Sequence, residues 1–135
     1  MGLSGSGKTE FAKQLFNSLI DRKLRVDWYN ADKLRHYYND WDFTKDGRIR
    51  QAHRLSSLAH HSECDYVICD FIAPLLEMRN IFAADLIIWM DTVKSSKFTD
   101  TDVIFTVPIN YDYRVTNYDE SFIETLNLVI EELTV

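Results

Sequence analysis

The chain begins with a phosphate-binding loop. The run Gly2-Leu3-Ser4-Gly5-Ser6-Gly7-Lys8-Thr9 has the pattern G-x-x-x-x-G-K-[ST]. The glycines let backbone N–H groups turn toward a polyphosphate, Lys8 reaches the β- and γ-phosphates, and the Thr9 hydroxyl can ligate Mg²⁺. Apolar residues at helical spacing follow over residues 8–22, so the loop opens a helix, as the motif requires. We expect residues 2–9 to bind ATP and Mg²⁺, and a chance match that binds no nucleotide is the alternative.

Strand and helix patterns alternate along the rest of the chain. Strands are expected at 24–29, 66–69, 86–90 and 111–116, and helices at 31–38, 47–61, after Pro74 and at 119–133, with 92–104 polar and irregular. This alternation predicts an α/β fold, a three-layer sandwich with a mainly parallel sheet, in a single domain over residues 1–135.

The position of the loop is unusual, because the motif normally follows a buried strand and only Met1 precedes it here. We expect a central strand of about six to eight apolar residues to belong upstream of Met1, since strands have about that length. In the 135-residue chain, a gap or a substitute strand should occupy its place. Loss of that strand would leave its neighbours without hydrogen-bond partners, which favours a nucleotide-binding module without turnover as one hypothesis.

Acidic residues follow two of the expected strands. Asp70 ends the apolar run 66–69, a pattern typical of a strand buried on both faces, with Cys69 inside it. An aspartate in this position can support Mg²⁺ beside a phosphate loop, and a solvent-facing or helix-capping carboxylate is the alternative. Asp32 could accept a proton from a hydroxyl group, with Arg35 holding an anion one turn later. Spacing alone favours a helix cap, by Asn30 or Asp32, with an ion pair between residues three apart.

The net charge of −6 argues against nonspecific binding of nucleic acid or of a membrane surface. A local basic pocket remains compatible with it, because arginines gather between residues 48 and 54, although a solvated helix face explains them equally. No apolar run is long enough to span a membrane, and two cysteines are too few for a disulfide framework. We expect a cytoplasmic protein, and the sequence is compatible with a homodimer.

Several segments, taken in order, resemble adenylyl-sulfate kinase, a phosphate-loop kinase. The loop has the form typical of that family, and the resemblance extends to about residue 104. The segments that carry it are Ala31-Asp32-Lys33-Leu34-Arg35-His36, Phe43-Thr44-Lys45-Asp46-Gly47-Arg48, Phe71-Ile72-Ala73-Pro74 and, more weakly, Ser96-Lys97-Phe98-Thr99.

The resemblance implies ATP- and Mg²⁺-dependent transfer of a phosphoryl group to the 3′-hydroxyl of adenylyl sulfate, giving phosphoadenylyl sulfate for sulfate assimilation. Lys8 and Asp32 would be catalytic, with Asp32 beside the acceptor hydroxyl as base or orienter, and Thr9 and Asp70 would serve the metal. The implied acceptor-binding residues are Arg35 and Arg48 for the phosphosulfate, Phe43 and Phe98 around the adenine, Ile72 through its backbone, Gln51 where the family has Asn, and Lys97 as a remaining basic side chain.

The departures from the family pattern concern mainly the acceptor. Gln51 and His53 replace family residues, and the segment 92–104 is far shorter than the family's lid. A related kinase for a nucleoside, sugar or polynucleotide hydroxyl is therefore an alternative hypothesis, and the net charge counts modestly against the polynucleotide.

Overall fold

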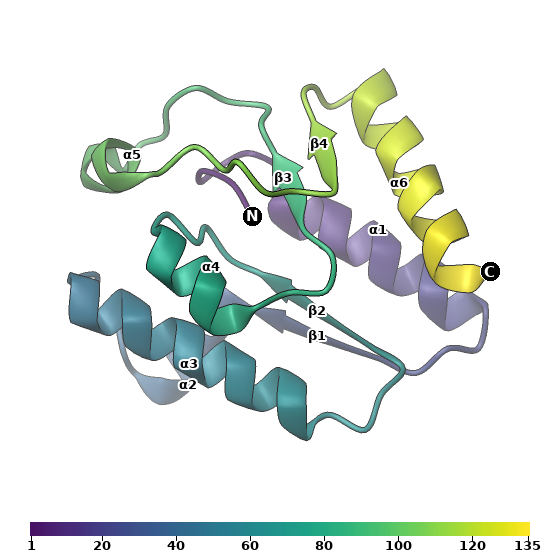
Figure 1. Ribbon diagram of the computed structural model, residues 1–135, viewed down its shortest axis with the longest axis horizontal. Helices are drawn as coiled ribbons and strands as arrows, with labels where there is room; N and C mark the ends of the chain where they lie inside the picture. Colours follow the sequence, from purple (N-terminus) through teal and green to yellow (C-terminus); the bar gives the residue numbers. More distant parts are fainter.

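The computed structural model describes all 135 residues, with helices on both sides of short parallel strands (Figure 1). In chain order, the elements are α1 (Lys8–Asp21), β1 (Val26–Asn30), α2 (Ala31–Tyr38), α3 (Lys45–His61), β2 (Tyr66–Asp70), α4 (Leu76–Phe82), β3 (Ile88–Met90), α5 (Thr99–Ile104), β4 (Tyr113–Val115) and α6 (Glu120–Thr134). The predicted alternation of strands and helices is confirmed, and element ends differ from the expected ones by a few residues.

Side-chain hydrogen bonds cap the amino ends of α2 and α3. The Asn30 side chain accepts a hydrogen bond from the Lys33 amide at 3.0 Å and caps α2. The Thr44 hydroxyl accepts one from the Gly47 amide at 3.2 Å and caps α3. Such caps satisfy backbone donors that the first turn of a helix leaves free. The cap at α2 fixes where β1 ends and therefore where Asp32 lies.

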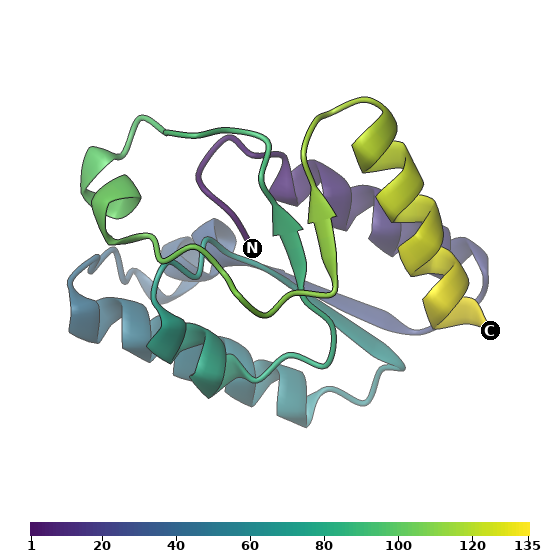
Figure 2. The ribbon, with the colours of Figure 1, turned by 45° about the horizontal axis from the view of Figure 1, so that its top comes forward.

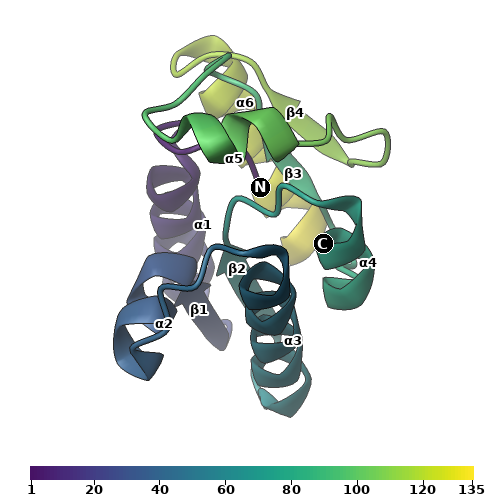
Figure 3. The ribbon, with the colours of Figure 1, turned by 90° about the vertical axis from the view of Figure 1, so that its left-hand side faces the viewer.

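The helices form two layers around the strands, as predicted. On one side, apolar residues of α1 and α6 pack with those of β3 and β4 into the larger core, and Phe11 meets Phe122 edge-on with ring centroids 5.1 Å apart. On the other side, α3 and α4 build a smaller core around Ala52, Leu55 and Met78. Figure 3 shows α1 and α3 on opposite sides of β1 and β2. Burial of these faces drives the assembly of the three layers.

The strands form two separate parallel pairs. β1 pairs with β2 in the register Val26↔Tyr66, and β3 pairs with β4 in the register Ile88↔Tyr113. No hydrogen-bonded strand joins β2 to β3, and the chain begins between them (Figure 2). The expected gap at the place of a central strand is therefore present.

The gap is an apolar cavity of about 570 Å³, which we call the central slot. Its lining includes side chains of α1, β2 and β3, among them Leu15, Ile68, Cys69 and Ile88. The prediction that β2 is buried on both faces is wrong for this reason. Its residues from Tyr66 to Cys69 are only partly buried, because one face borders the slot.

One further difference concerns the segment expected to be irregular. Residues 92–104 were expected to lack regular structure, but α5 forms over Thr99–Ile104. The Ser96 hydroxyl and amide both bond to the Asp102 carboxylate at 2.7 Å, which ties the segment before α5 to the helix itself. This local hydrogen bonding stabilises a short helix that shows little apolar periodicity. No helix in the structure has the length and apolar character needed to cross a membrane.

The amino group of Met1 generates a prediction about stability and pH. It is buried against the Ile88 carbonyl, and burial lowers its pKa from 8.0 to about 5, with the charges of Lys8, Asp70 and Arg79 also acting on it. In the unfolded chain the amine keeps its ordinary pKa, so between pH 5 and 8 the unfolded state binds more protons. The free energy of unfolding should therefore rise with pH across this interval and level off above pH 8.

Urea unfolding of the 135-residue chain and of its Nα-acetylated form at pH 5 to 8 measures this effect. The acetylated form has no amine to titrate, so its free energy of unfolding should vary less over the same interval. Equal pH dependence in the two forms would contradict a buried, neutral amine.

Candidate functional site

The phosphate-binding loop lies at the carboxyl ends of β2 and β3, where α/β sheets bind ligands. Gly2 donates to the Ile72 carbonyl beyond β2, while Met1 bonds to β3. Gly7 precedes α1 with a φ of 91°, a left-handed conformation that glycine adopts without strain. The loop thus delivers the amino end of α1 to the site, as the motif predicts.

Two hydroxyl groups hold the outer side of the loop. The Thr92 hydroxyl donates to the Ser6 carbonyl at 2.8 Å, and the Tyr118 hydroxyl donates to the Gly5 carbonyl. The Tyr118 ring also covers Gly7, where an added Cβ would lie only 2.7 Å from a ring carbon. Because peptide units are planar, these bonds fix two successive peptide planes of the loop. Neither residue could be predicted from the sequence, since a lone threonine and a lone tyrosine follow no phosphate-binding pattern.

Lys8 lies folded onto the loop. Its ammonium group donates to the Leu3 carbonyl at 2.9 Å. Burial lowers the pKa of Lys8, while the nearby carboxylates of Asp70 and Asp32 act in the opposite direction. A buried cation that bonds only to a carbonyl can exchange that partner for a phosphate oxygen, which supplies a full opposing charge.

Asp70 joins the loop helix to both strands of the first pair. Its carboxylate lies 3.3 Å from the Thr9 hydroxyl and accepts hydrogen bonds from Trp28 Nε1 at 3.0 Å and Asn30 Nδ2 at 2.9 Å. It is 6% exposed, so the alternative of a solvent-facing carboxylate is excluded. Mg²⁺ prefers hard oxygen ligands and takes only one or two from the protein beside substrate phosphates. The Thr9 and Asp70 oxygens fit that requirement.

The acceptor residues predicted from the sequence lie around α2 and the start of α3. Asp32 is exposed in the first turn of α2, just beyond β1, and its charge acts on Lys8. Asn30, and not Asp32, caps this helix, so the carboxylate of Asp32 is free for other contacts. The helix cap that spacing favoured is therefore confirmed, with Asn30 as the capping residue. The expected ion pair is not formed, because Arg35 donates to the Asp40 and Asp42 carbonyls, and a catalytic role of Asp32 stays a prediction.

Arg35 and Arg48 both lie close to the ring of Phe43. Their guanidinium carbons lie 4.4 Å and 5.5 Å from the ring centroid, and both side chains are buried. Arg35 donates to two backbone carbonyls, and Arg48 donates to the Phe43 carbonyl and to the Thr101 hydroxyl. Burial lowers the pKa of both arginines. Arg35 has no carboxylate partner, and the nearest carboxylate oxygen to Arg48, on Asp100, is 4.0 Å away.

A cavity of about 320 Å³ opens beside this cluster. It is lined by Phe43, Lys45, Arg48, Leu75, Asp100 and Ile104, so it lies between the start of α3 and α5. Its volume is at the lower end of the range for small-molecule sites. The short α5 therefore forms one wall of the pocket that Phe43 and Arg48 line.

The other two arginines of α3 form ion pairs with a carboxylate. Arg50 and Arg54 both pair with the Asp40 carboxylate, at 2.8 Å and 3.0 Å, and this pairing holds the pKa of Asp40 far below its usual range. Gln51 is buried, and its amide bonds to the Ala31 carbonyl and to Arg54. Gln51 therefore stabilises the start of α2 and does not line the pocket.

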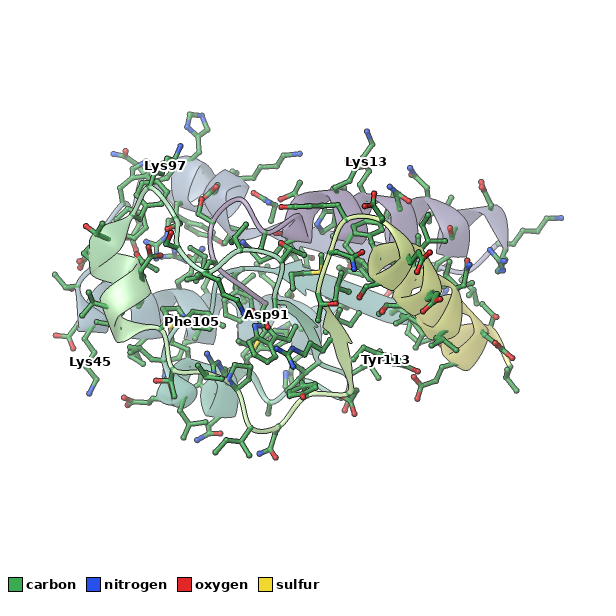
Figure 4. The ribbon with its side chains drawn as sticks, turned by 90° about the horizontal axis from the view of Figure 1, so that it is seen from above. Lys13, Lys45, Asp91, Lys97, Phe105 and Tyr113 are labelled. Carbon is green, nitrogen blue, oxygen red and sulfur yellow. The ribbon has the colours of Figure 1, made fainter.

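Three further residues that were predicted to bind the acceptor do not line this pocket. The Ile72 carbonyl accepts the 3.4 Å bond from Gly2, so its backbone borders the loop. Lys97 and Phe98 lie just before α5, both exposed, with the ammonium 5.1 Å from the ring centroid. Figure 4 shows Lys97 at the end of the molecule that α5 forms, well away from Asp91 at its centre. Asp91 itself is paired with Arg114, which occupies its carboxylate.

Comparisons with known proteins agree with this geometry. The model of the family described as adenylylsulphate kinase matches residues 1–110. An adenylyl-sulfate kinase of Bacillus pumilus (strain SAFR-032) is 34% identical over 83 residues, which are 59% of this chain and 42% of that protein. The chain therefore spans less than half the length of this curated relative.

Two solved structures of the Mycobacterium tuberculosis APS kinase CysC share the fold. A Cys556Ala mutant has a TM-score of 0.77 and 29% identity, covering 100% of this chain and 94% of that one. A complex with AMPPNP and APS has a TM-score of 0.79 and 25% identity, covering 100% and 95%.

The bonds from Tyr118 and Thr92 to the loop generate a prediction about nucleotide binding. Tyr118→Phe and Thr92→Val each remove one hydrogen bond to a loop carbonyl and leave the side-chain shape nearly unchanged. Each should weaken the binding of ADP in the presence of Mg²⁺ about fivefold, the equivalent of about 1 kcal/mol. Titration calorimetry measures the affinity, and Tyr37→Phe, at a side chain 80% exposed, is the matched control. Unchanged affinity in both variants would show that the loop needs neither bond.

Proposed function

The chain belongs to the adenylylsulphate kinase family, and from that premise we propose that it transfers the γ-phosphoryl group of ATP to the 3′-hydroxyl of adenylyl sulfate. One observation supports the acceptor most directly. Arg48 lines the pocket between α3 and α5, and Arg35 lies over the Phe43 ring beside it. Both are buried and lack a close carboxylate partner, while their neighbours Arg50 and Arg54 share Asp40. An uncompensated buried cation is costly, and an anionic ligand removes that cost.

The loop and Asp70 support the ATP side of this proposal. The loop amides and Lys8 would hold the polyphosphate of ATP, with Lys8 leaving the Leu3 carbonyl for a phosphate oxygen. Thr9 and Asp70 would hold Mg²⁺ between them. When bound, the metal would neutralise charge on the β- and γ-phosphates.

The acceptor would lie between α2, α3 and α5. Arg35 and Arg48 would bind its phosphosulfate, and the exposed face of Phe43 would stack on its adenine. Phe98 and Lys97, beside α5, would approach from the other side. Ile72 would contribute through its backbone, and Gln51 would act indirectly by supporting α2 through the Ala31 carbonyl.

The chemistry then requires few protein groups. The acceptor oxygen forms a bond to the γ-phosphorus while the bond from that phosphorus to the β–γ bridging oxygen breaks. The proton of the hydroxyl passes to Asp32, and the charge left on ADP is held by Lys8 and the loop amides. Positioning and charge neutralisation supply most of the catalysis in such transfers. Both cysteines are free thiols, which supports a cytoplasmic location for this activity.

The unpaired arginines generate the first test. Arg48→Gln should raise the KM for adenylyl sulfate at least tenfold, because charge-assisted hydrogen bonds contribute about 1.5–3 kcal/mol. Arg50→Gln, on the same helix but paired with Asp40, should change it less than about twofold. A coupled ADP-release assay gives both constants, and unchanged ADP affinity confirms that the variant is folded. Equal effects of the two substitutions would contradict the assigned role of Arg48.

Asp32 generates the second test. Asp32→Asn keeps the size of the side chain but cannot accept the proton, so kcat should fall about 10²–10⁴-fold. The KM for ATP should change little, because Asp32 does not belong to the loop. Asp46→Asn, in the first turn of α3, is the control. Retention of full kcat by Asp32→Asn over the whole pH range would remove Asp32 from the mechanism.

A further inference from the structure

Helix α5 contacts Arg48 through two successive residues. Arg48 Nη2 donates a hydrogen bond to the Thr101 hydroxyl at 3.1 Å, and it lies 4.0 Å from a carboxylate oxygen of Asp100. Figure 1 shows α5 beside the amino end of α3, the part of the helix that carries Arg48. Because Arg48 and Thr101 are both buried, their hydrogen bond fixes α5 against α3. The carboxylate of Asp100 is thereby held next to Arg48.

The two contacts differ in strength. The hydrogen bond to Thr101 is buried and has an ordinary length. The contact with Asp100 is longer than a hydrogen bond, and 77% of the Asp100 side chain is exposed. An ion pair with so exposed a member contributes little, because water solvates the carboxylate almost as well when it turns away. Asp100 is therefore attracted to Arg48 without being fixed to it.

Asp100 is the one carboxylate that lines the pocket between α3 and α5. The lining contains two cations, Lys45 and Arg48, and Lys45 pairs at 3.4 Å with Glu77, which does not line the pocket. Burial lowers the pKa of Arg48, and the charge of Asp100 acts in the opposite direction. Asp100 therefore supplies the negative charge that Arg48 meets inside the pocket.

An anion that binds to Arg48 must compete with this carboxylate. Two negative groups within about 4 Å of one guanidinium repel each other, and the cavity of about 320 Å³ is small. Asp100 must therefore turn away when an anion binds, and the loss of its attraction to Arg48 lowers the affinity of the anion. Only a ligand with further contacts in the pocket, such as stacking on Phe43, compensates for this loss.

We propose that Asp100 is a specificity-determining residue of the acceptor pocket, which competes with the anionic group of the acceptor for Arg48 and thereby disfavours small inorganic anions. Adenylyl sulfate can displace the carboxylate because its adenine also contacts the pocket. Inorganic sulfate has similar anionic chemistry without the base, so it binds weakly. This inference rests on the role of Arg48 in the proposed function.

Titration of the 135-residue chain with sodium sulfate at constant ionic strength tests the competition. The NMR signal of the Arg48 Nε–H group reports binding in the pocket, and the amide signals of Gly5 and Gly7 report separately any sulfate at the phosphate-binding loop. Asp100→Asn should tighten sulfate binding at Arg48 about fivefold, since an ion pair with one exposed member is a modest interaction. Asp100→Glu keeps the charge and should bind sulfate as weakly as the unsubstituted chain.

Asp46→Asn is the matched control, because it removes the same charge from the first turn of α3 and does not line the pocket. It should change the affinity for sulfate less than about twofold. Equal sulfate affinity at Arg48 in Asp100→Asn and Asp46→Asn would overturn the proposal. Weaker binding in Asp100→Asn would also overturn it, since that result is expected of a carboxylate that only stabilises α5.

A kinetic measurement separates this inference from the proposed activity. If both hold, Asp100→Asn should lower the KM for adenylyl sulfate about fivefold, as it lowers the dissociation constant of sulfate. Tighter sulfate binding at Arg48 without any turnover of adenylyl sulfate would support the competition and contradict the kinase activity. Turnover with a KM and a sulfate affinity that Asp100→Asn leaves unchanged would support the activity and overturn the role of Asp100.

Discussion

The backbone of Met1 and Gly2 bridges the two halves of the sheet, and the geometry of the site depends on it. Met1 pairs with β3, and Gly2 bonds to the end of the chain segment that leaves β2. The phosphate-binding loop follows at once, so its direction is set by these few bonds. Asp70 adds a side-chain link from β2 to Thr9 at the start of α1. Without these contacts, Lys8 and Thr9 would have no fixed relation to the acceptor residues on α2 and α3.

Charge pairing then separates structural arginines from functional ones. Arg50 and Arg54 share the Asp40 carboxylate and hold the segment before α3 in place. Arg35 and Arg48 are buried and bond mainly to neutral oxygens, so they keep a positive potential at the pocket. An acidic chain with a net charge of −6 thus keeps a local site for an anion.

Sequence patterns predicted the elements and the loop because each has a local signal. The motif located Lys8 and Thr9, and strand-ending aspartates located Asp70. The width of the slot, the partial exposure of β2 and the role of Tyr118 depend on contacts between distant segments, which no local pattern contains. Gln51 illustrates the same limit, since its sequence position indicated an acceptor contact and the fold directs its amide to Ala31 and Arg54. Helix α5 was missed because local hydrogen bonds, and not apolar periodicity, stabilise it.

In the proposed reaction, a loop held between two strand pairs positions ATP against an anionic hydroxyl acceptor. Mass spectrometry of the products tests it most directly, with the 135-residue chain, ATP, Mg²⁺ and equal amounts of adenylyl sulfate, AMP, adenosine and ribose. We expect one new phosphorylated product, phosphoadenylyl sulfate, formed together with an equal amount of ADP. Phosphorylation of a neutral acceptor in its place, or ADP binding without any product, would contradict it.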